Sequence, residues 1–171
     1  MLYVCSLPRM PSVVSNVRAQ RLISLLSAGT PVERPDTIHE ENHLLLSMHD
    51  IVQVEPDMVP PGQKHVEELL NFALGWDRIK PMVVHCYAGV SRSTAAAYII
   101  GCQLAPHRDE AELARELRLA SPSATPNARL IAIADKLLGR EGRMVSAIAA
   151  IGRGADAFEG EPFELRFDPR T

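Results

Sequence analysis

The chain has 171 residues, of which 46% are hydrophobic and 23% are charged, and its formal net charge is -3. This length is enough for one buried core and short for two full domains. High apolar content with a small net charge argues against a disordered chain. The 18 basic and 21 acidic residues leave no bulk cationic field, so we expect no nucleic-acid partner. The composition predicts a soluble, single-domain protein.

Cysteine and histidine usage gives no sign of a metal site or a disulfide framework. The three cysteines are widely spaced without a CxxC pair, and the six histidines show no ligand spacing such as HExxH. No apolar run approaches the roughly 18 residues of a membrane span, and none at the N-terminus suits a signal peptide. We therefore expect a cytoplasmic protein with free thiols, no metal, no cofactor and no membrane partner. The sequence indicates no oligomeric state.

Short apolar runs alternate with turn-rich connections in the first half of the chain. Residues 29–43 and 50–62 predict loops, because both are polar and contain prolines. Residues 65–79 carry apolar side chains at helical spacing and predict an amphipathic helix. Buried strands are predicted at residues 2–7, 22–26, 44–47 and 82–84.

The second half of the chain is predicted to be helical. Residues 92–104 are apolar almost all round, as in a central buried helix. Thr125 and Pro126 predict the N-cap and first turn of another helix. The predicted helices span residues 92–104, 109–120, 125–138 and 141–151. Early strands and late helices predict a single α/β domain, with a central, mostly parallel sheet of about four to five strands flanked by helices.

The C-terminal segment differs from the rest of the chain. Phe158, Phe163 and Phe167 are three of the four phenylalanines, and residues 163–167 alternate apolar with charged side chains. We expect a domain over residues 1–151 and a tail over residues 152–171 that packs on it, with a short strand. The alternative is that the tail covers part of a binding site or forms a dimer contact.

The most informative stretch lies where the last predicted strand ends and the buried helix begins. Backbone N–H groups at a helix N-terminus lack partners, so this position favours an anion. Gly89 lets the loop curl so that successive N–H groups converge, and Arg92 adds a planar fork for two phosphate oxygens. The stretch reads His85-Cys86-Tyr87-Ala88-Gly89-Val90-Ser91-Arg92-Ser93-Thr94.

The cysteine in this stretch is a candidate nucleophile. Its sulfur lies under the positive field of the helix N-terminus and Arg92, which favours the thiolate. Ser93 follows the arginine and can donate a hydrogen bond to the sulfur, which helps the thiolate to leave in a second step. The same loop therefore predicts both a nucleophile, Cys86, and a binding site for the phosphate that it attacks.

The loop resembles the HCxxGxxR[ST] signature of cysteine-dependent protein tyrosine phosphatases at every fixed position. Residues 121–127 resemble the RPxxxPN segment of the dual-specificity branch, although Ser121 stands where that branch usually has arginine. We expect a compact, bacterial member of this branch with a phosphatase-like fold. The resemblance implies that backbone amides of residues 87–92 bind phosphate, and that His85 and Asn127 support the site.

Phosphatases of this family use an upstream aspartate as general acid, and the chain offers two candidates. Asp50 directly follows the predicted strand at residues 44–47, where the dual-specificity branch places its acid. Asp57 has the commoner spacing to the cysteine but lies within the proline-rich loop. We expect Asp50 to be the acid, with Asp57 as the alternative.

The resemblance implies phosphomonoester hydrolysis by a two-step phosphocysteine mechanism. The expected substrate is phosphotyrosine in proteins, with dual specificity as an extension. One alternative is a phosphoinositide or RNA 5′-phosphatase on the same scaffold. The uncharged loop residues argue against a multiply phosphorylated substrate; they are Tyr87, Ala88, Val90 and Ser91. A second alternative is a module that binds phosphate without catalysis.

Overall fold

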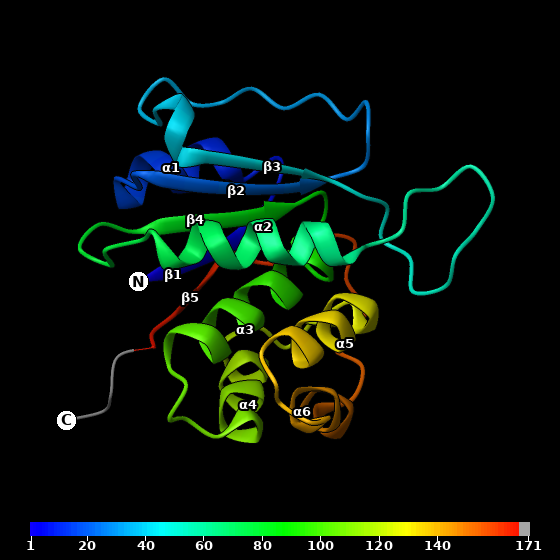
Figure 1. Cartoon of the computed structure of the whole chain (residues 1–171). Helices are drawn as coiled ribbons and strands as arrows, with labels where there is room; N and C mark the ends of the chain where they lie inside the picture. The colour runs from blue at the N-terminus through cyan, green and yellow to red at the C-terminus, as the bar shows by residue number, and fades with distance from the viewer. Residues whose placement is uncertain (168–171) are drawn as a thin grey trace.

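A computed structural model describes residues 1–167 and shows a five-stranded sheet with helices on both faces (Figure 1). The strand order is β3-β2-β4-β1-β5. The four strands β1 to β4 run parallel, and β5 pairs antiparallel with the edge of β1. The strands are β1 (Leu2–Ser6), β2 (Arg21–Leu26), β3 (His43–Ser47), β4 (Met82–Cys86) and β5 (Phe163–Leu165). The predicted α/β class and mostly parallel sheet are confirmed.

The helices divide unequally between the two faces of the sheet (Figure 1). A single helix, α1, packs on β1 and β4 from one side, together with part of the connection from β2 to β3. The other face carries all remaining helices. The helices are α1 (Met10–Val17), α2 (Gln63–Leu74), α3 (Arg92–Leu104), α4 (Glu110–Ala120), α5 (Ala128–Leu137) and α6 (Arg143–Ile151), with a short 3-10 turn at Glu40–Asn42.

Helix α3 lies at the centre of the larger layer. Every residue from Arg92 to Cys102 is buried, because α3 contacts the sheet on one side and α2, α4 and α5 on the others. This accounts for its apolar, small-residue sequence, which offers no polar face to solvent. The helix that follows the signature motif is therefore fixed on all sides, and so is the position of its N-terminus.

Helices α2 and α6 differ from their predicted bounds for local reasons. Helix α2 ends at Leu74 and not at residue 79, because Gly75 caps it and the side chain of Trp76 turns inward to donate to the carbonyl of Lys80 (2.8 Å). Helix α6 begins at Arg143, since the preceding Gly142 has a positive φ of 85°. Helix α1 was not predicted.

The C-terminal segment adds an edge strand to the sheet. Phe163 in β5 and Phe167 beyond it are buried, whereas Phe158 is fully exposed. The ring of Phe167 lies against Gly101 of α3, where an added Cβ would come within 2.6 Å of it. Residues 168–171, the end of the predicted tail, lie outside the described residues.

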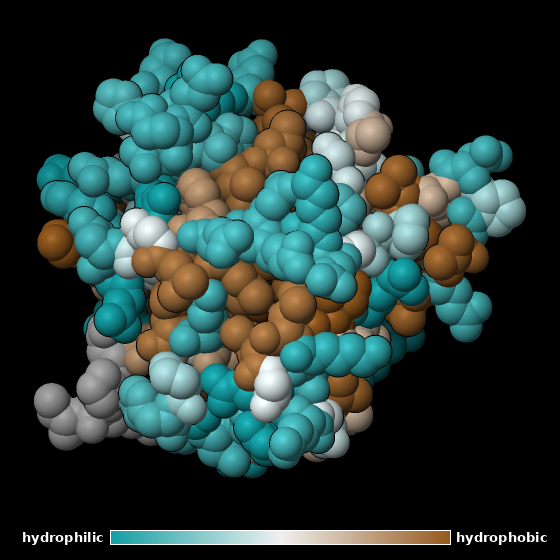
Figure 2. Space-filling view, viewed as in Figure 1, coloured by the Kyte–Doolittle hydropathy of each residue, from teal (hydrophilic) through white to brown (hydrophobic). Residues whose placement is uncertain are grey.

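A long loop, residues 51–62, projects from the body between β3 and α2 (Figure 1). Apolar and polar side chains lie next to each other on this projection (Figure 2). Its exposed apolar side chains are Val52, Val54, Met58 and Val59. The predicted loop character of this stretch agrees with the structure, and Asp57 lies on the projection.

Candidate active site

Residues 86–92, here called the signature loop, connect the central strand β4 to the buried helix α3. Ligands in parallel α/β sheets bind at the carboxyl ends of the strands, which is where this loop lies. Gly89 is required at its turn, since its φ is +72° and an added Cβ would lie 2.8 Å from the backbone of Cys5 and Ser6. The fold therefore presses the loop against β1 and sets its curvature.

The carbonyl groups of the signature loop are held by the surrounding protein. The carbonyl of Tyr87 accepts from the N–H of Leu7 (3.1 Å), and the carbonyl of Ala88 accepts from Gly160 (2.8 Å). On the opposite side, the N–H of Thr125 donates to Val90 (2.9 Å). These carbonyls point outward because their donors lie in separate segments around the loop.

The outward carbonyls dictate where the amides of the loop point. A trans peptide unit directs its C=O and the next N–H to opposite sides, so the N–H groups of residues 88, 89 and 91 face the inside of the loop. One of them gives an independent check, since the N–H of Gly89 donates to the sulfur of Cys86 (3.3 Å). Converging N–H groups at a helix N-terminus form a site for an anion with several oxygens.

The sulfur of Cys86 lies at the bottom of this ring. Cys86 is 2% exposed, and its Sγ lies 3.1 Å from the hydroxyl of Ser93 in the first turn of α3. With the N–H of Gly89, the sulfur has two polar neighbours that stabilise negative charge on it. The predicted pairing of Cys86 with Ser93 is thus present in the geometry.

The guanidinium group of Arg92 is buried, and not all of its N–H groups have a hydrogen-bond acceptor. Its Nη1 donates to the carbonyl of Met48 (2.8 Å) and to Ser27 Oγ (3.3 Å), which fixes the guanidinium plane. Its Nε is buried and has no hydrogen-bond partner among the described residues. An unpaired buried N–H on a cation is unfavourable, and a bound phosphate oxygen would supply its acceptor.

Asp50 is hydrogen-bonded to the signature loop and to the segment that supports it. Its Oδ1 accepts hydrogen bonds from the hydroxyl of Ser91 (2.7 Å) and from Asn127 Nδ2 (2.8 Å). Asn127 also caps α5, because its Oδ1 accepts from the N–H of Arg129 (3.0 Å) and Leu130 (3.1 Å). One side chain therefore joins the start of a helix to the exposed carboxylate beside the loop.

The capping by Asn127 corrects the predicted start of α5. Thr125 and Pro126 were expected at its N-cap and first turn, but the helix begins at Ala128. Thr125 serves the signature loop instead through its N–H, and its Oγ1 accepts from the N–H of Gly154 (3.1 Å).

Asp57 is not brought to the signature loop. It lies on the projecting loop in the left-handed conformation (φ 59°), and its side chain is exposed. The structure therefore separates the two candidate acids. Only Asp50 makes hydrogen bonds to residues of the signature loop and its supporting segment.

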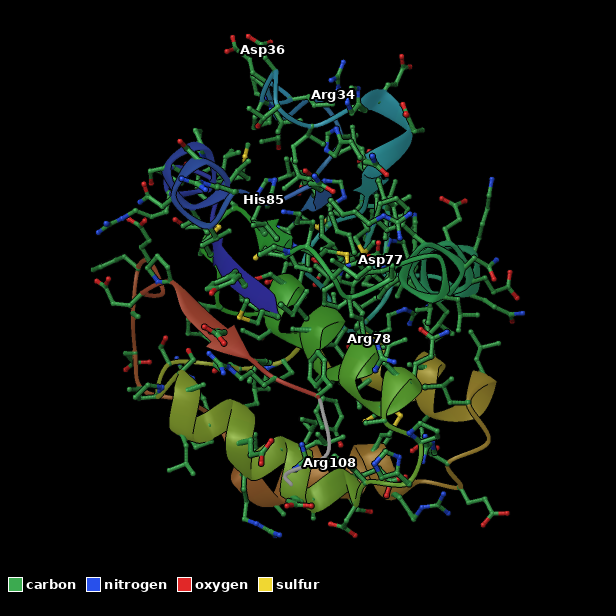
Figure 3. The ribbon with its side chains drawn as sticks, turned by 90° about the vertical axis from the view of Figure 1, so that its left-hand side faces the viewer. Arg34, Asp36, Asp77, Arg78, His85 and Arg108 are labelled. Atoms are coloured by element: carbon green, nitrogen blue, oxygen red, sulfur yellow. The ribbon has the colours of Figure 1, made fainter. Side chains whose placement is uncertain are left out.

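His85 lies in the interior of the sheet, directly before Cys86 (Figure 3). Its Nε2 is 2.6 Å from Ser24 Oγ, which in turn is 2.9 Å from His43 Nε2, and its Nδ1 is 3.4 Å from the carbonyl of Cys86. Burial lowers the pKa of His85 to about 4, so the ring is neutral near pH 7. A neutral His85 suits a supporting role and not proton transfer.

The other two cysteines are kept unreactive by burial. Burial raises the pKa of Cys5 to about 12 and that of Cys102 to about 12, so both are protonated thiols at neutral pH. Cys5 is paired in register with His85 and Ser6 with Cys86, which places the side chains of Cys5 and Cys86 on opposite faces of the sheet. All three cysteines are free thiols.

Several contributors to the site were not predicted. Ser27, the carbonyl of Met48, Ser24 and Gly160 hold Arg92, His85 or the signature loop from distant parts of the chain. Ser27 and Met48 directly follow β2 and β3, and that position is the only signal that could have pointed to them; no signal singles out Ser24 within β2 or Gly160 in the C-terminal segment. Within residues 1–167, no group of three or more His, Cys, Asp or Glu side chains is arranged to hold a metal ion. None of the helices in that range is long and apolar enough to span a membrane.

Solved structures with the same fold include tyrosine and dual-specificity phosphatases. The Cydia pomonella PTP-2 phosphatase is 18% identical, with a TM-score of 0.61, over 79% of this chain and 84% of that chain. Human DUSP28 is 17% identical, with a TM-score of 0.60, over 88% and 95%. PTPMT1, solved in complex with PI(5)P, is 14% identical, with a TM-score of 0.63, over 88% and 94%.

No protein-family model matches the chain, and no curated protein sequence is significantly similar to it. At the identities of the solved structures, the similarity establishes the fold. The chain therefore has the fold of dual-specificity and tyrosine phosphatases, and the resemblance predicted from the signature loop is confirmed at that level. Its activity is a proposal.

Proposed function

We propose that the protein hydrolyses phosphotyrosine in proteins through a phosphocysteine intermediate on Cys86. The observation that carries this proposal is the sulfur of Cys86 beneath a ring of inward N–H groups, next to the hydroxyl of Ser93. Buried Arg92, with its unpaired Nε, adds the cation that a phosphate dianion requires. The fold shared with known phosphatases supports the same reading.

In the first step, the Cys86 thiolate attacks phosphorus while the bond to the tyrosyl oxygen breaks. The amides of the signature loop and Arg92 neutralise the charge on the three remaining phosphate oxygens. The leaving oxygen takes a proton from the carboxylic acid of Asp50. Both hydrogen bonds to that carboxyl end on Oδ1, so the transferred proton is carried by Oδ2.

In the second step, water attacks the phosphocysteine and the sulfur–phosphorus bond breaks. The Asp50 carboxylate formed in the first step removes a proton from this water, which returns it to the acid form. The thiolate that leaves is stabilised by the Ser93 hydroxyl and the N–H of Gly89. The products are inorganic phosphate and free enzyme.

The side chains of the signature loop favour a monophosphorylated aryl substrate. Between Cys86 and Arg92 the loop carries no charged side chain that could meet a second phosphate. PTPMT1, which has the same fold, was solved in complex with PI(5)P, so the test of substrate class includes phosphoinositides.

The test is the hydrolysis of a phosphotyrosine peptide and of a panel of phosphoinositides by the wild type, Cys86→Ser and Arg92→Lys. We expect peptide turnover by the wild type, none by Cys86→Ser, and a loss of about 10²–10³-fold in Arg92→Lys, since the planar fork and a fixed donor are lost. Near-normal turnover by Cys86→Ser would overturn the mechanism. A clear preference for inositides over the peptide would overturn the proposed substrate.

A further inference from the structure

Residues 152–162, here called the C-terminal strap, pass over the signature loop between α6 and β5. At one end of the strap, the N–H of Gly160 donates to the carbonyl of Ala88 in the loop (2.8 Å). The contact is so close that a Cβ added at Gly160 would lie 2.8 Å from the carbonyl oxygen of Gly89. This end of the strap is therefore fixed directly on the loop.

The other end of the strap is fixed to the segment that precedes α5. The N–H of Ala155 donates to the carbonyl of Pro122 (2.9 Å), and the N–H of Gly154 donates to Thr125 Oγ1 (3.1 Å). Only residues 156–159 lie between the two attachments. A segment this short between two fixed ends holds its backbone in a defined position, as a preorganised binding wall requires.

An open hollow of about 530 Å³ lies between the strap, the signature loop and Thr125. Its apolar and small polar lining consists of Val90, Ser91, Thr125, Ala155, Ala157 and Phe158. Arg153 and Asp156 also line the hollow, but they form an exposed ion pair with each other (2.6 Å). The hollow is thus suited to a neutral, apolar group.

Two features connect the hollow to the chemistry of the loop. Ser91 lines it and also donates to Asp50 (2.7 Å), so a group in the hollow lies close to the acid. Phe158 is fully exposed, although the other two phenylalanines of the tail are buried in the core. A large aromatic side chain held in solvent beside a binding loop marks an interaction site.

We propose that this hollow receives the aromatic ring of the substrate and that Phe158 determines the preference for aryl phosphates by packing against that ring. The inference rests on the proposed function, which places the phosphate in the signature loop. It adds the side chains that recognise the aromatic group to which the phosphate is attached. In this arrangement the ring lies beside Val90 and Ser91, which belong both to the signature loop and to the lining of the hollow.

The experiment measures binding of two phosphonates to the full-length chain by calorimetry. Naphthylmethylphosphonate carries an aromatic ring and methylphosphonate does not. Neither is hydrolysed, because the carbon–phosphorus bond is stable. The variants are wild type, Phe158→Ala and Ile79→Ala. Ile79 is a matched control, since it is exposed and precedes β4, at the opposite end of this strand from the signature loop.

The wild type is expected to bind the aryl ligand at least about tenfold more tightly than methylphosphonate. Phe158→Ala should weaken the aryl ligand by roughly three- to tenfold and change methylphosphonate by less than about twofold. Ile79→Ala should change neither. Because Phe158 makes no buried contacts, its removal leaves the melting temperature unchanged.

Equal affinities of the two ligands for the wild type, or an unchanged aryl affinity in Phe158→Ala, would overturn the inference. A dimer that dissociates in Phe158→Ala without a change in aryl affinity would assign the residue to a contact between two copies and overturn it as well. Failure of the proposed function would give a different result. The wild type would then still bind the aryl phosphonate more tightly than methylphosphonate, but it would hydrolyse no phosphotyrosine peptide.

Discussion

The two candidate general acids, Asp50 and Asp57, differ sharply in their surroundings. Asp50 is held by Ser91 and Asn127, whereas Asp57 is exposed on the projecting loop. We predict that Asp50→Ala lowers kcat about 10²–10⁴-fold, because the leaving oxygen no longer receives a proton. Asp57→Ala should change kcat by less than about threefold. Steady-state kinetics with phenyl phosphate measure both variants.

The leaving group supplies the internal control for this prediction. Para-nitrophenolate leaves without much need of a proton, so Asp50→Ala should lose less of its kcat/KM, which reports the departure of the phenol, on para-nitrophenyl phosphate than on phenyl phosphate. An equal loss on the two esters would show that Asp50 has no role in protonation. A larger loss in Asp57→Ala than in Asp50→Ala would reverse the assignment.

The residues that could be predicted from the sequence are those with fixed local spacing. Cys86, Gly89 and Arg92 follow one another within one strand–loop–helix turn, and their roles depend on geometry that this turn imposes. Ser27 and the carbonyl of Met48 hold Arg92 from two other strand ends. Those contacts depend on the order of strands in the sheet, which no local pattern contains.

Among the larger elements, the C-terminal strap affects the site most directly. We predict that Gly160→Ala disturbs the signature loop, because its Cβ would lie 2.8 Å from the carbonyl oxygen of Gly89, a backbone atom that cannot rotate away. The expected cost is about 1–3 kcal/mol of the free energy of unfolding, with a loss of kcat/KM of about tenfold or more.

Gly75→Ala provides the matched control for this substitution. Gly75 has a negative φ, and a Cβ there meets its neighbours at ordinary contact distances of 3.6–3.7 Å. It should therefore leave both stability and activity close to the wild type. If Gly160→Ala behaves like Gly75→Ala in urea unfolding and in kinetics, the strap does not control the loop.

Elements were predictable where a pattern of side chains coincides with burial. The strands β1, β2 and β4 and helix α3 are apolar runs enclosed by other elements, and their positions agree with the sequence within one or two residues. The strand at residues 44–47 was also expected to be buried, but β3 lies at the edge of the sheet and only Leu46 in it is buried. Helix α1 is only eight residues long, and α5 starts at Ala128 because the side chain of Asn127, which also binds Asp50, caps it. Such boundaries depend on tertiary contacts and not on local propensity.

For the molecule as a whole, buried His85 predicts a dependence of stability on pH. Burial lowers its pKa in the folded state to about 4, whereas an unfolded histidine titrates near 6.5. Between these values the unfolded chain binds a proton that the folded protein does not, so the free energy of unfolding decreases as pH falls from about 6.5 to 4. The full difference is about 3 kcal/mol.

Urea unfolding between about pH 7.5 and 4.5 measures this dependence. His85→Gln should flatten the decrease, and the exposed His107→Gln should not. Burial also lowers the pKa of His43, so His43→Gln is expected to flatten the curve further in the same direction. A slope that is identical in wild type and His85→Gln would show that the buried ring does not set the acid sensitivity.

The central claim is that Cys86 carries the phosphoryl group during turnover. Rapid acid quenching of the wild type with a phosphotyrosine peptide, followed by mass spectrometry of its fragments, tests this directly. The account predicts a phosphorylated fragment that contains Cys86 in the wild type and none in Cys86→Ser. Peptide turnover with the phosphoryl group on another residue, or on none, would contradict it.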